Sequence, residues 1–257
     1  MRRTLRWIVP ALLLFSIPGR AHKPITSKYT YTEDVFPIVN ARCGRCHMTG
    51  GVAPMSLLTY KEAIPWAESM RVELTADHMP SWYVDNDSHR LSSRELDILL
   101  TWATGGTPEG PSKRLTTAPV KSEWKLGKPD LILPLPNAST LGPDTMEDTV
   151  DVALQTAEGR DRWIRALDVL PGTPAIVRSA MLYSKSPDGE TVMDIWFPGD
   201  DPMVIPSETA FRWTAGAELR LRIHYKKTWT YDGKTVTDRT SIGVYLTNQA
   251  PKHELHT

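Results

Sequence analysis

The two halves of the chain space their apolar residues differently. Up to about residue 105 these residues recur every three or four positions, as they do on one face of an α-helix. Thr59 with Glu62, and Ser92 with Glu95, have the spacing of a capping box, which predicts a helix start at each place. Another helix is predicted to begin at Thr32. The helically spaced residues are Ala63, Trp66, Ala67, Met70, Leu74, Leu96, Leu99 and Leu100.

After residue 122 the apolar residues mostly alternate with polar ones, which is typical of β-strands. The clearest run is AELRLRIHYKK, and turn signals such as PGTP, SPDG, PGDDP and YDGK separate runs of this kind. Its apolar set is Leu219, Leu221, Ile223 and Tyr225, and its polar set is Arg220, Arg222, His224 and Lys226. The two sets are predicted to lie on opposite faces of one strand. Roughly eight strands are predicted in this half.

Together these patterns predict an α+β multidomain chain, in which a small all-α domain precedes an all-β sandwich or jelly-roll domain. The all-α domain would span residues 22–105, and the all-β domain residues 123–250. Residues 106–122 are rich in Pro, Thr and Ser and have no periodicity, so they are predicted to form a linker. Residues 251–257 are predicted to form a tail.

Residues 1–21 have the pattern of a secretory signal peptide. A basic start is followed by an apolar run from Trp7 to Ile17 and by small residues at Gly19 and Ala21. A periplasmic or otherwise exported location is therefore predicted, and the alternative is that this segment stays as a membrane anchor. The segment holds four arginines and no acidic residue, whereas the whole chain has a formal net charge of zero. The remaining chain is thus mildly acidic, which argues against a nucleic-acid partner.

The only two cysteines of the chain, Cys43 and Cys46, stand in the sequence CGRCH, which His47 completes. C-x-x-C-H is the attachment signature of c-type haem, in which the thiols bond to the haem and the adjacent histidine binds the iron. A zinc site would need four ligands, and the chain has no second cysteine pair. A redox-active pair is typical of a βαβ context, and a disulfide here would close too small a loop to stabilise much. The motif therefore predicts one covalently bound haem c.

The second axial ligand of the iron is sought among the methionines and histidines that follow the motif. Met79 precedes a proline, which favours extended backbone, and it lies between the two later helices, where the chain can return across the haem. We therefore predict Met79 as the distal ligand, with His78 as the alternative. Met70 falls in a helical apolar stripe and is assigned to core packing, while Met48 and Met55 stand close behind the motif.

Residues 29–110 resemble a class I cytochrome c domain. The segments DVFPIVNARCGRCHMTGGVAPMSLLTY, MPSW and LSSRELDILLTWATGGTPEG resemble a group of bacterial secreted monohaem cytochromes. In that group the haem domain precedes a β-domain similar to copper type II, ascorbate-dependent monooxygenases. The resemblance implies that Cys43 and Cys46 anchor the haem. It also implies that His47 is the proximal ligand of the iron and Met79 the distal one.

The segments WKLGKPDLILPLP, DRWIRALDVLPG, VMDIWFPG and LRLRIHYKKTW resemble that monooxygenase-like β-domain. A copper site there would need a histidine pair after the PG turn and an H-x-H on a later strand. This chain has Arg178, Ser179 and Ala180 at the first place. At the second place it keeps His224 but has Lys226, whose charge opposes a bound cation. Bound copper is therefore not expected.

The function predicted from the sequence is that of a periplasmic monohaem c-type cytochrome that carries single electrons and is not an enzyme. Its β-domain would serve docking or assembly in a larger redox complex. The expected partners are redox proteins, including subunits of a membrane-associated electron-transfer complex; neither nucleic acid nor a small-molecule substrate is expected. Two alternatives stay open. One is a haem or copper oxidoreductase that uses the β-domain, and the other is a non-catalytic accessory subunit of a membrane complex.

Overall fold

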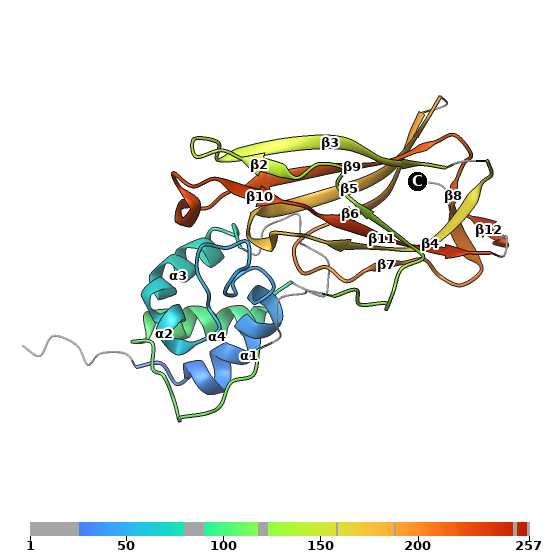
Figure 1. Cartoon of the computed structure of the whole chain (residues 1–257). Helices are drawn as coiled ribbons and strands as arrows, with labels where there is room; N and C mark the ends of the chain where they lie inside the picture. Colours follow the sequence, from blue (N-terminus) through green and yellow to red (C-terminus); the bar gives the residue numbers. More distant parts are fainter. Residues whose placement is uncertain are drawn as a thin grey trace, which may run out of the picture.

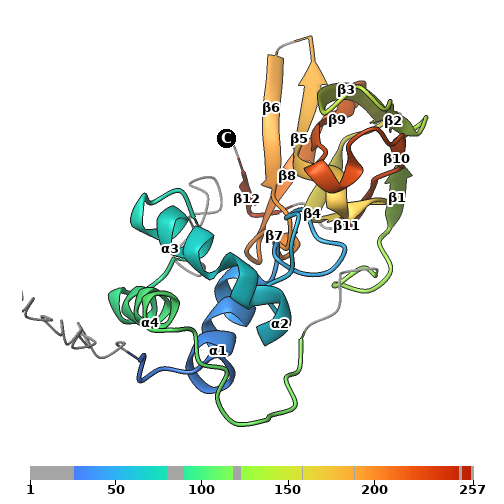
Figure 2. The ribbon, with the colours of Figure 1, turned by 90° about the vertical axis from the view of Figure 1, so that its left-hand side faces the viewer.

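The computed structural model describes residues 26–79, 90–117, 123–157, 159–187, 189–248 and 251–255. Helical segments from the first part of the chain lie beside a larger β-region, and residues 44–59 run up to its strands (Figure 1, Figure 2). The predicted signal peptide and the MPSW residues after Met79 lie outside the described residues. Within the described ranges no helix is both long enough and apolar enough to cross a membrane.

The first part of the chain forms short helical pieces that follow one another closely. They are the π-helical η1 (Tyr31–Val35) and η2 (Val39–Cys43), the 3-10 turn η3 (Ile64–Trp66), and the α-helices α1 (Phe36–Ile38), α2 (Tyr60–Ala63), α3 (Ala67–Thr75) and α4 (Ser93–Thr104). The helix predicted to start after Thr59 is therefore divided into three pieces, α2, η3 and α3. Pro65 explains the division, because it has no backbone N–H to donate along a regular helix.

The longest of these helices, α4, begins and ends where the sequence predicts. The hydroxyl of Ser92 accepts a hydrogen bond from the Glu95 backbone N–H at 3.2 Å, and the Glu95 carboxylate accepts one from the Ser92 backbone N–H at 2.7 Å. This confirms the capping box, and Gly105 forms the C-cap. Trp102 on α4 is fully buried, with its ring centre 5.9 Å from that of Tyr31. Its indole thus packs α4 against η1.

The residues after α4 fold back over the helical pieces. The carbonyl oxygen of Pro108 accepts hydrogen bonds from the Tyr31 backbone N–H at 2.9 Å and from Trp102 Nε1 at 3.0 Å. The Tyr60 hydroxyl donates to the carbonyl oxygen of Thr107 at 3.1 Å. These bonds tie the first residues of the predicted linker to η1, α2 and α4.

The β-region contains three sheets. One has six strands in the order β1-β11-β4-β8-β12, with β7 paired to β4; a second has the order β3-β9-β5-β6, and β10 pairs with β2. The strands are β1 (Leu131–Pro134), β2 (Ser139–Leu141), β3 (Glu147–Thr156), β4 (Arg162–Leu170), β5 (Val177–Ser186), β6 (Gly189–Trp196), β7 (Met203–Val204), β8 (Thr209–Trp213), β9 (Glu218–Lys226), β10 (Val236–Asp238), β11 (Ser241–Thr247) and β12 (His253–Glu254). Short 3-10 turns are η5 (Pro174–Ile176) and η6 (Trp229–Tyr231). Buried side chains from the two larger sheets form one hydrophobic core.

Strand β9 alternates as its sequence predicts. Its four apolar residues, Leu219, Leu221, Ile223 and Tyr225, are all 0% exposed. On the opposite face Arg220 and Arg222 each form an ion pair with Asp151 of the neighbouring strand β3. The prediction for this strand is therefore confirmed. It follows from the two-residue period of a strand that has one face against the core.

A buried carboxylate joins several parts of the β-region. Asp238, at the end of β10, is 1% exposed. Its two oxygens accept hydrogen bonds from the Thr173 backbone N–H at 2.7 Å, the Tyr225 hydroxyl at 2.9 Å, and the backbone N–H and hydroxyl of Thr240 at 2.9 and 2.7 Å. This one side chain therefore connects β9, β10 and the turn before η5. Its burial is tolerated because four donors replace the water that it loses.

The predicted fold class, a small all-α cytochrome c domain followed by an all-β sandwich or jelly-roll domain, is wrong. The chain is mostly β, with 34% of its residues in strands, 22% in helices and three sheets. Within the described residues no small all-α cytochrome domain is formed. Only α3 and α4 among the described α-helices are longer than four residues. In addition, the turn after η2 is bonded to the β-region, so the helical pieces do not close on themselves alone.

Candidate functional site

The CGRCH motif forms a compact turn at the end of η2. Cys43 is the last residue of η2, and its carbonyl oxygen accepts hydrogen bonds from the backbone N–H groups of Cys46 at 3.1 Å and His47 at 2.9 Å. Beyond the turn, the carbonyl oxygens of Cys46 and His47 accept hydrogen bonds from the N–H groups of Ala53 and Leu57 at 3.1 and 3.0 Å. The backbone therefore carries two thiols and one imidazole on a single turn and fixes the loop that follows.

The two cysteines are free, and each residue as a whole is half-buried although its thiol points inward. Burial raises the pKa of the Cys43 thiol to about 12, and the nearby Cys46 and Glu95 act in the same direction. Burial also raises the pKa of Cys46, although the charges of Arg45 and Arg178 oppose this. Both groups are therefore protonated at neutral pH, unlike the thiolate of a redox-active pair.

His47 has a buried ring nitrogen, Nδ1, that has no hydrogen-bond partner in the structure. Burial lowers the pKa of the imidazole, and an interaction with the Met55 backbone partly opposes this. The ring is therefore neutral at pH 7, which is the form in which histidine binds a metal. Two free thiols and a neutral, incompletely bonded imidazole on one turn are the donor set that haem c requires, so the residues present fit that group.

The apolar surroundings of the motif come from the helical pieces. Cys43 packs against their buried cluster, and so do the half-buried side chains of Met55, Tyr60 and Met70. The cluster itself consists of Tyr31, Val35, Phe36, Ile38, Val39, Leu57, Ala63, Ala67, Leu74, Ile98, Leu99 and Trp102. A porphyrin bonded to Cys43 would therefore have an apolar wall beside it.

The two candidates for the distal ligand lie in the turn after α3. Met79 is 40% exposed. The side chain of His78 is 68% exposed, and its Nδ1 lies 3.2 Å from the carboxylate of Glu73. A ligand of buried iron must itself be covered, so either side chain would have to turn inward. The assignment of Met79 stays a prediction, and half-buried Met55 and Met70 lie on the same cluster as Cys43.

The places where a copper site would need histidines hold other interactions. His224 Nε2 lies 2.7 Å from the Glu147 carboxylate, and Lys226 Nζ lies 2.9 Å from the same carboxylate. Arg178 donates through Nη1 to the carbonyl oxygen of Val52. Among the residues that the structure describes, no three or more His, Cys, Asp or Glu side chains are grouped to hold a metal ion.

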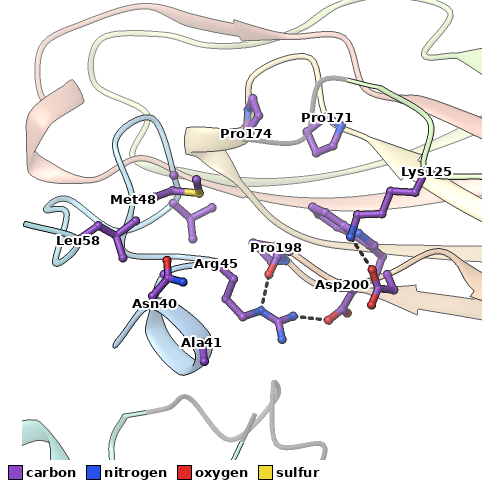
Figure 3. Close-up of a pocket in the computed structure, with 16 residues that line it drawn as sticks. Asn40, Ala41, Arg45, Met48, Leu58, Lys125, Pro171, Pro174, Pro198 and Asp200 are labelled. Carbon is purple, nitrogen blue, oxygen red and sulfur yellow. Dashed lines mark hydrogen bonds and ion pairs between the residues drawn. The ribbon is translucent and has the colours of Figure 1, made fainter. Parts of the chain in front are cut away.

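Arg45, inside the motif, anchors the turn to the β-region. Its Nε donates to the carbonyl oxygen of Pro198 at 2.9 Å, and its Nη2 forms an ion pair with Asp200 (Figure 3). The second oxygen of Asp200 accepts a hydrogen bond from the Phe197 backbone N–H at 2.8 Å. The Arg45 side chain is only 9% exposed. The contacts of Arg45 and the Arg178–Val52 bond therefore join the loop after η2 to the β-region at two places.

The close contact between Arg45 and the turn after β6 requires a glycine at position 199. Its φ of +84° lies in the left-handed region, and a Cβ at this position would stand 2.6 Å from Cβ of Arg45. The turn after β6 can therefore hold Arg45 only because residue 199 has no side chain.

A buried acidic group, Asp194 on β6, is close enough to Asp200 to be affected by its charge. Burial, together with the charges of Asp200 and Asp168, raises the pKa of Asp194 to about 6. Since its ordinary value is 3.8, the folded chain binds this proton more tightly than the unfolded chain does. Stability should therefore fall as the pH rises from about 4 to about 6, and should stay lower above that range.

We expect Asp194→Asn to remove the pH-dependent loss of stability that the buried Asp194 carboxylate causes. Relative to the unchanged protein, the free energy of unfolding of the variant should be higher by about 2–3 kcal/mol at pH 8, and the advantage should shrink by about 2 kcal/mol at pH 4. Urea titrations of both proteins at the two pH values measure this. The exposed Asp201→Asn is the control. An advantage of Asp194→Asn that did not change with pH would contradict the prediction.

A search with models of known protein families found no match to this chain, and a comparison with curated proteins found none either.

Sequence reasoning predicted Cys43, Cys46 and His47 as site residues, and their roles stay predictions. It did not indicate the contact between Arg45 and Asp200. No pattern in the sequence points to this pair, because the middle residues of a C-x-x-C-H motif vary freely. Their partnership depends on which turn of the β-region approaches the motif. The one sequence feature related to this contact is the glycine at position 199, which lies against Arg45.

Proposed function

We propose that this chain is a monohaem c-type cytochrome of the periplasm that carries single electrons. The observation that supports it most is the single turn on which two free thiols and a neutral, incompletely bonded imidazole stand together. Bound haem would supply one-electron chemistry at its iron. The β-region would serve docking to redox partner proteins or assembly in a larger complex.

The residues of this chain have separate tasks in the proposal. Cys43 and Cys46 hold the macrocycle, and His47 offers a neutral ring nitrogen to the iron. The apolar cluster of the helical pieces excludes water from one side of the site. Arg45 fixes the turn against the β-region, which keeps the geometry of the thiols and the imidazole constant.

Expression of the full chain together with a haem-attachment system tests the proposal. We expect haem that stays with the polypeptide on a denaturing gel and a low-spin absorption spectrum in both redox states. A co-expressed cytochrome of known attachment serves as the control. If that control matured while this chain carried no covalent haem, the proposal would be wrong. A high-spin spectrum would instead favour the oxidoreductase alternative, because an open iron can bind substrate.

The distal ligand can be identified with matched methionine variants. If Met79 binds the iron, Met79→Ala should abolish the weak far-red sulfur-to-iron band, lower the reduction potential and open the iron to added imidazole. Met70→Ala should leave all three properties unchanged. Loss of the band in Met70→Ala but not in Met79→Ala would reassign the ligand.

A further inference from the structure

The β-region has a strand edge that residues 251–255, the covering segment, cover only in part. Strand β8 pairs with β4 on one side, and on its other side β12 lies opposite Thr209 and Ala210. The backbone N–H groups of His253 and Leu255 donate to the carbonyl oxygens of Glu208 and Ala210 at 3.1 and 3.0 Å. The half-buried side chain of Leu255 packs against the core. Among the described residues no strand pairs with β8 beyond Ala210 on this side, so the rest of the edge is open.

The covering segment is held weakly. Its strand β12 has two residues and runs parallel to β8, which is the less stable kind of strand pairing. Its two ion pairs, Lys252–Glu208 at 2.6 Å and Glu254–Arg212 at 4.0 Å, join side chains that are partly or largely exposed, where such pairs add little stability. Glu208 also has a φ of +72°, in the left-handed region that is unfavourable for a residue with a side chain. We therefore expect the covering segment to detach more easily than the rest of the sheet unfolds.

Positive charge lies around the open part of the edge. Arg212 on β8 and Arg162 on the neighbouring strand β4 each lie over an aromatic ring, 6.0 and 5.7 Å from the ring centres. Arg212 forms ion pairs with Asp161 and, on the covering segment, with Glu254. Arg162 and the exposed Arg160 form no ion pair within the part of the chain that the structure describes. Detachment of the covering segment removes Glu254 and leaves these three arginines with the carboxylate of Asp161, which favours an acidic ligand.

We infer that the β8 edge is a docking site for an acidic, extended segment of a partner protein, which adds to β8 as a further strand and displaces the covering segment. Such a segment can pair along all five residues of β8, whereas β12 pairs with two. It can also place a carboxylate at Arg212, as Glu254 does in the covering segment. The longer pairing and the added charge favour the partner over the covering segment.

The position of this edge suits a docking role. Figure 1 shows β12 at the end of the β-region that lies away from the helical pieces, so a segment docked there leaves the motif turn uncovered. The inference rests on the docking role proposed for the β-region and not on haem attachment. Absence of covalent haem would therefore leave it standing, and absence of docking would leave the haem proposal standing.

Calorimetry with two synthetic peptides tests the inference on the full chain, with or without attached haem. The peptides are Ac-TEVEVT-NH₂ and Ac-TKVKVT-NH₂, which have the same length and the same β-branched residues but opposite charge. We expect the acidic peptide to bind at one site, at least about tenfold more tightly than the basic one at low salt, because the arginines attract one and repel the other.

Arg212→Gln removes the charge at the centre of the site, so it should weaken binding of the acidic peptide about tenfold. Lys185→Gln, which removes an exposed cation from β5 in the other large sheet, is the matched control and should leave the affinity unchanged. Equal affinity for the two peptides, no binding of either, or full affinity in Arg212→Gln would overturn the inference.

Hydrogen exchange on the unchanged protein tests the displacement without any substitution. Saturation with the acidic peptide should make the backbone N–H groups of His253 and Leu255 exchange at least about tenfold faster, because they lose their acceptors on Glu208 and Ala210. The N–H of Leu167, which is fully buried in β4, is the control and should exchange as slowly as before. Binding of the peptide with unchanged exchange at His253 and Leu255 would mean that it docks elsewhere, and would contradict the inference.

Discussion

Replacing both Cys43 and Cys46 by alanine is expected to abolish covalent haem attachment while the chain still folds. The proposed attachment can use no other thiols, because Cys43 and Cys46 are the only cysteines of the chain. Folding should survive because the two residues are half-buried and form no disulfide. Haem staining of a denaturing gel measures attachment, and circular dichroism with urea unfolding measures the fold.

Each single cysteine variant should keep less haem than the unchanged protein and more than the double variant, since one thioether bond can still form. Thr49→Ala, at an exposed position just after the motif, is the control and should retain full attachment. Haem that remained covalently bound to the double variant would exclude the thioether assignment. Loss of the fold in the double variant would instead show that the thiols have a structural role.

Asp238→Ala is expected to lower the free energy of unfolding more than any of the other single substitutions described above. The substitution leaves four donors, from Thr173, Tyr225 and Thr240, without their shared acceptor in the interior of the β-region. Removing one partner from such a buried charged network costs about 3–5 kcal/mol. Urea unfolding followed by tryptophan fluorescence measures the change.

Asp238→Asn should cost less, because the amide keeps one acceptor oxygen but turns an N–H₂ group toward the donors. Asp232→Ala, at an exposed position nearby, should change stability by less than about 0.5 kcal/mol. A loss below about 1 kcal/mol in Asp238→Ala would mean that water replaces the carboxylate and that the network does not hold the strands together.

The features that sequence reasoning found correctly depend on local periodicity. The alternation of β9 and the capping box of α4 are each fixed by residues within a few positions of one another. A strand with one face against a core must alternate, and a helix start must satisfy its first N–H groups. The CGRCH motif is recognisable for the same reason, because its two cysteines and its histidine lie within five residues, but its role in haem binding stays a prediction.

The features that sequence reasoning missed depend on contacts between distant segments. Helical spacing predicted a closed all-α domain, but it carries no information on whether the pieces close on themselves or rest on strands. Pro65 divides one predicted helix, and the bonds of Arg45 and Arg178 join the motif loop to the β-region. A cavity lined by Arg45 and Trp196, among others, lies at this junction, so no segment of the sequence reveals it alone.

The distance along the chain between the motif and its anchors has a consequence for biosynthesis. Pro198 follows Arg45 by 153 residues, and Arg178 follows Val52 by 126. At translation rates of about 5 to 20 residues per second, the motif leaves the ribosome roughly 6 to 30 seconds before the residues that will hold its turn. During that interval the thiols stand on an undocked segment and are open to modification. If the proposed haem attachment occurs, folding of β5 and β6 sets its time limit, because it ends the period in which haem can reach the thiols from the side of the strands.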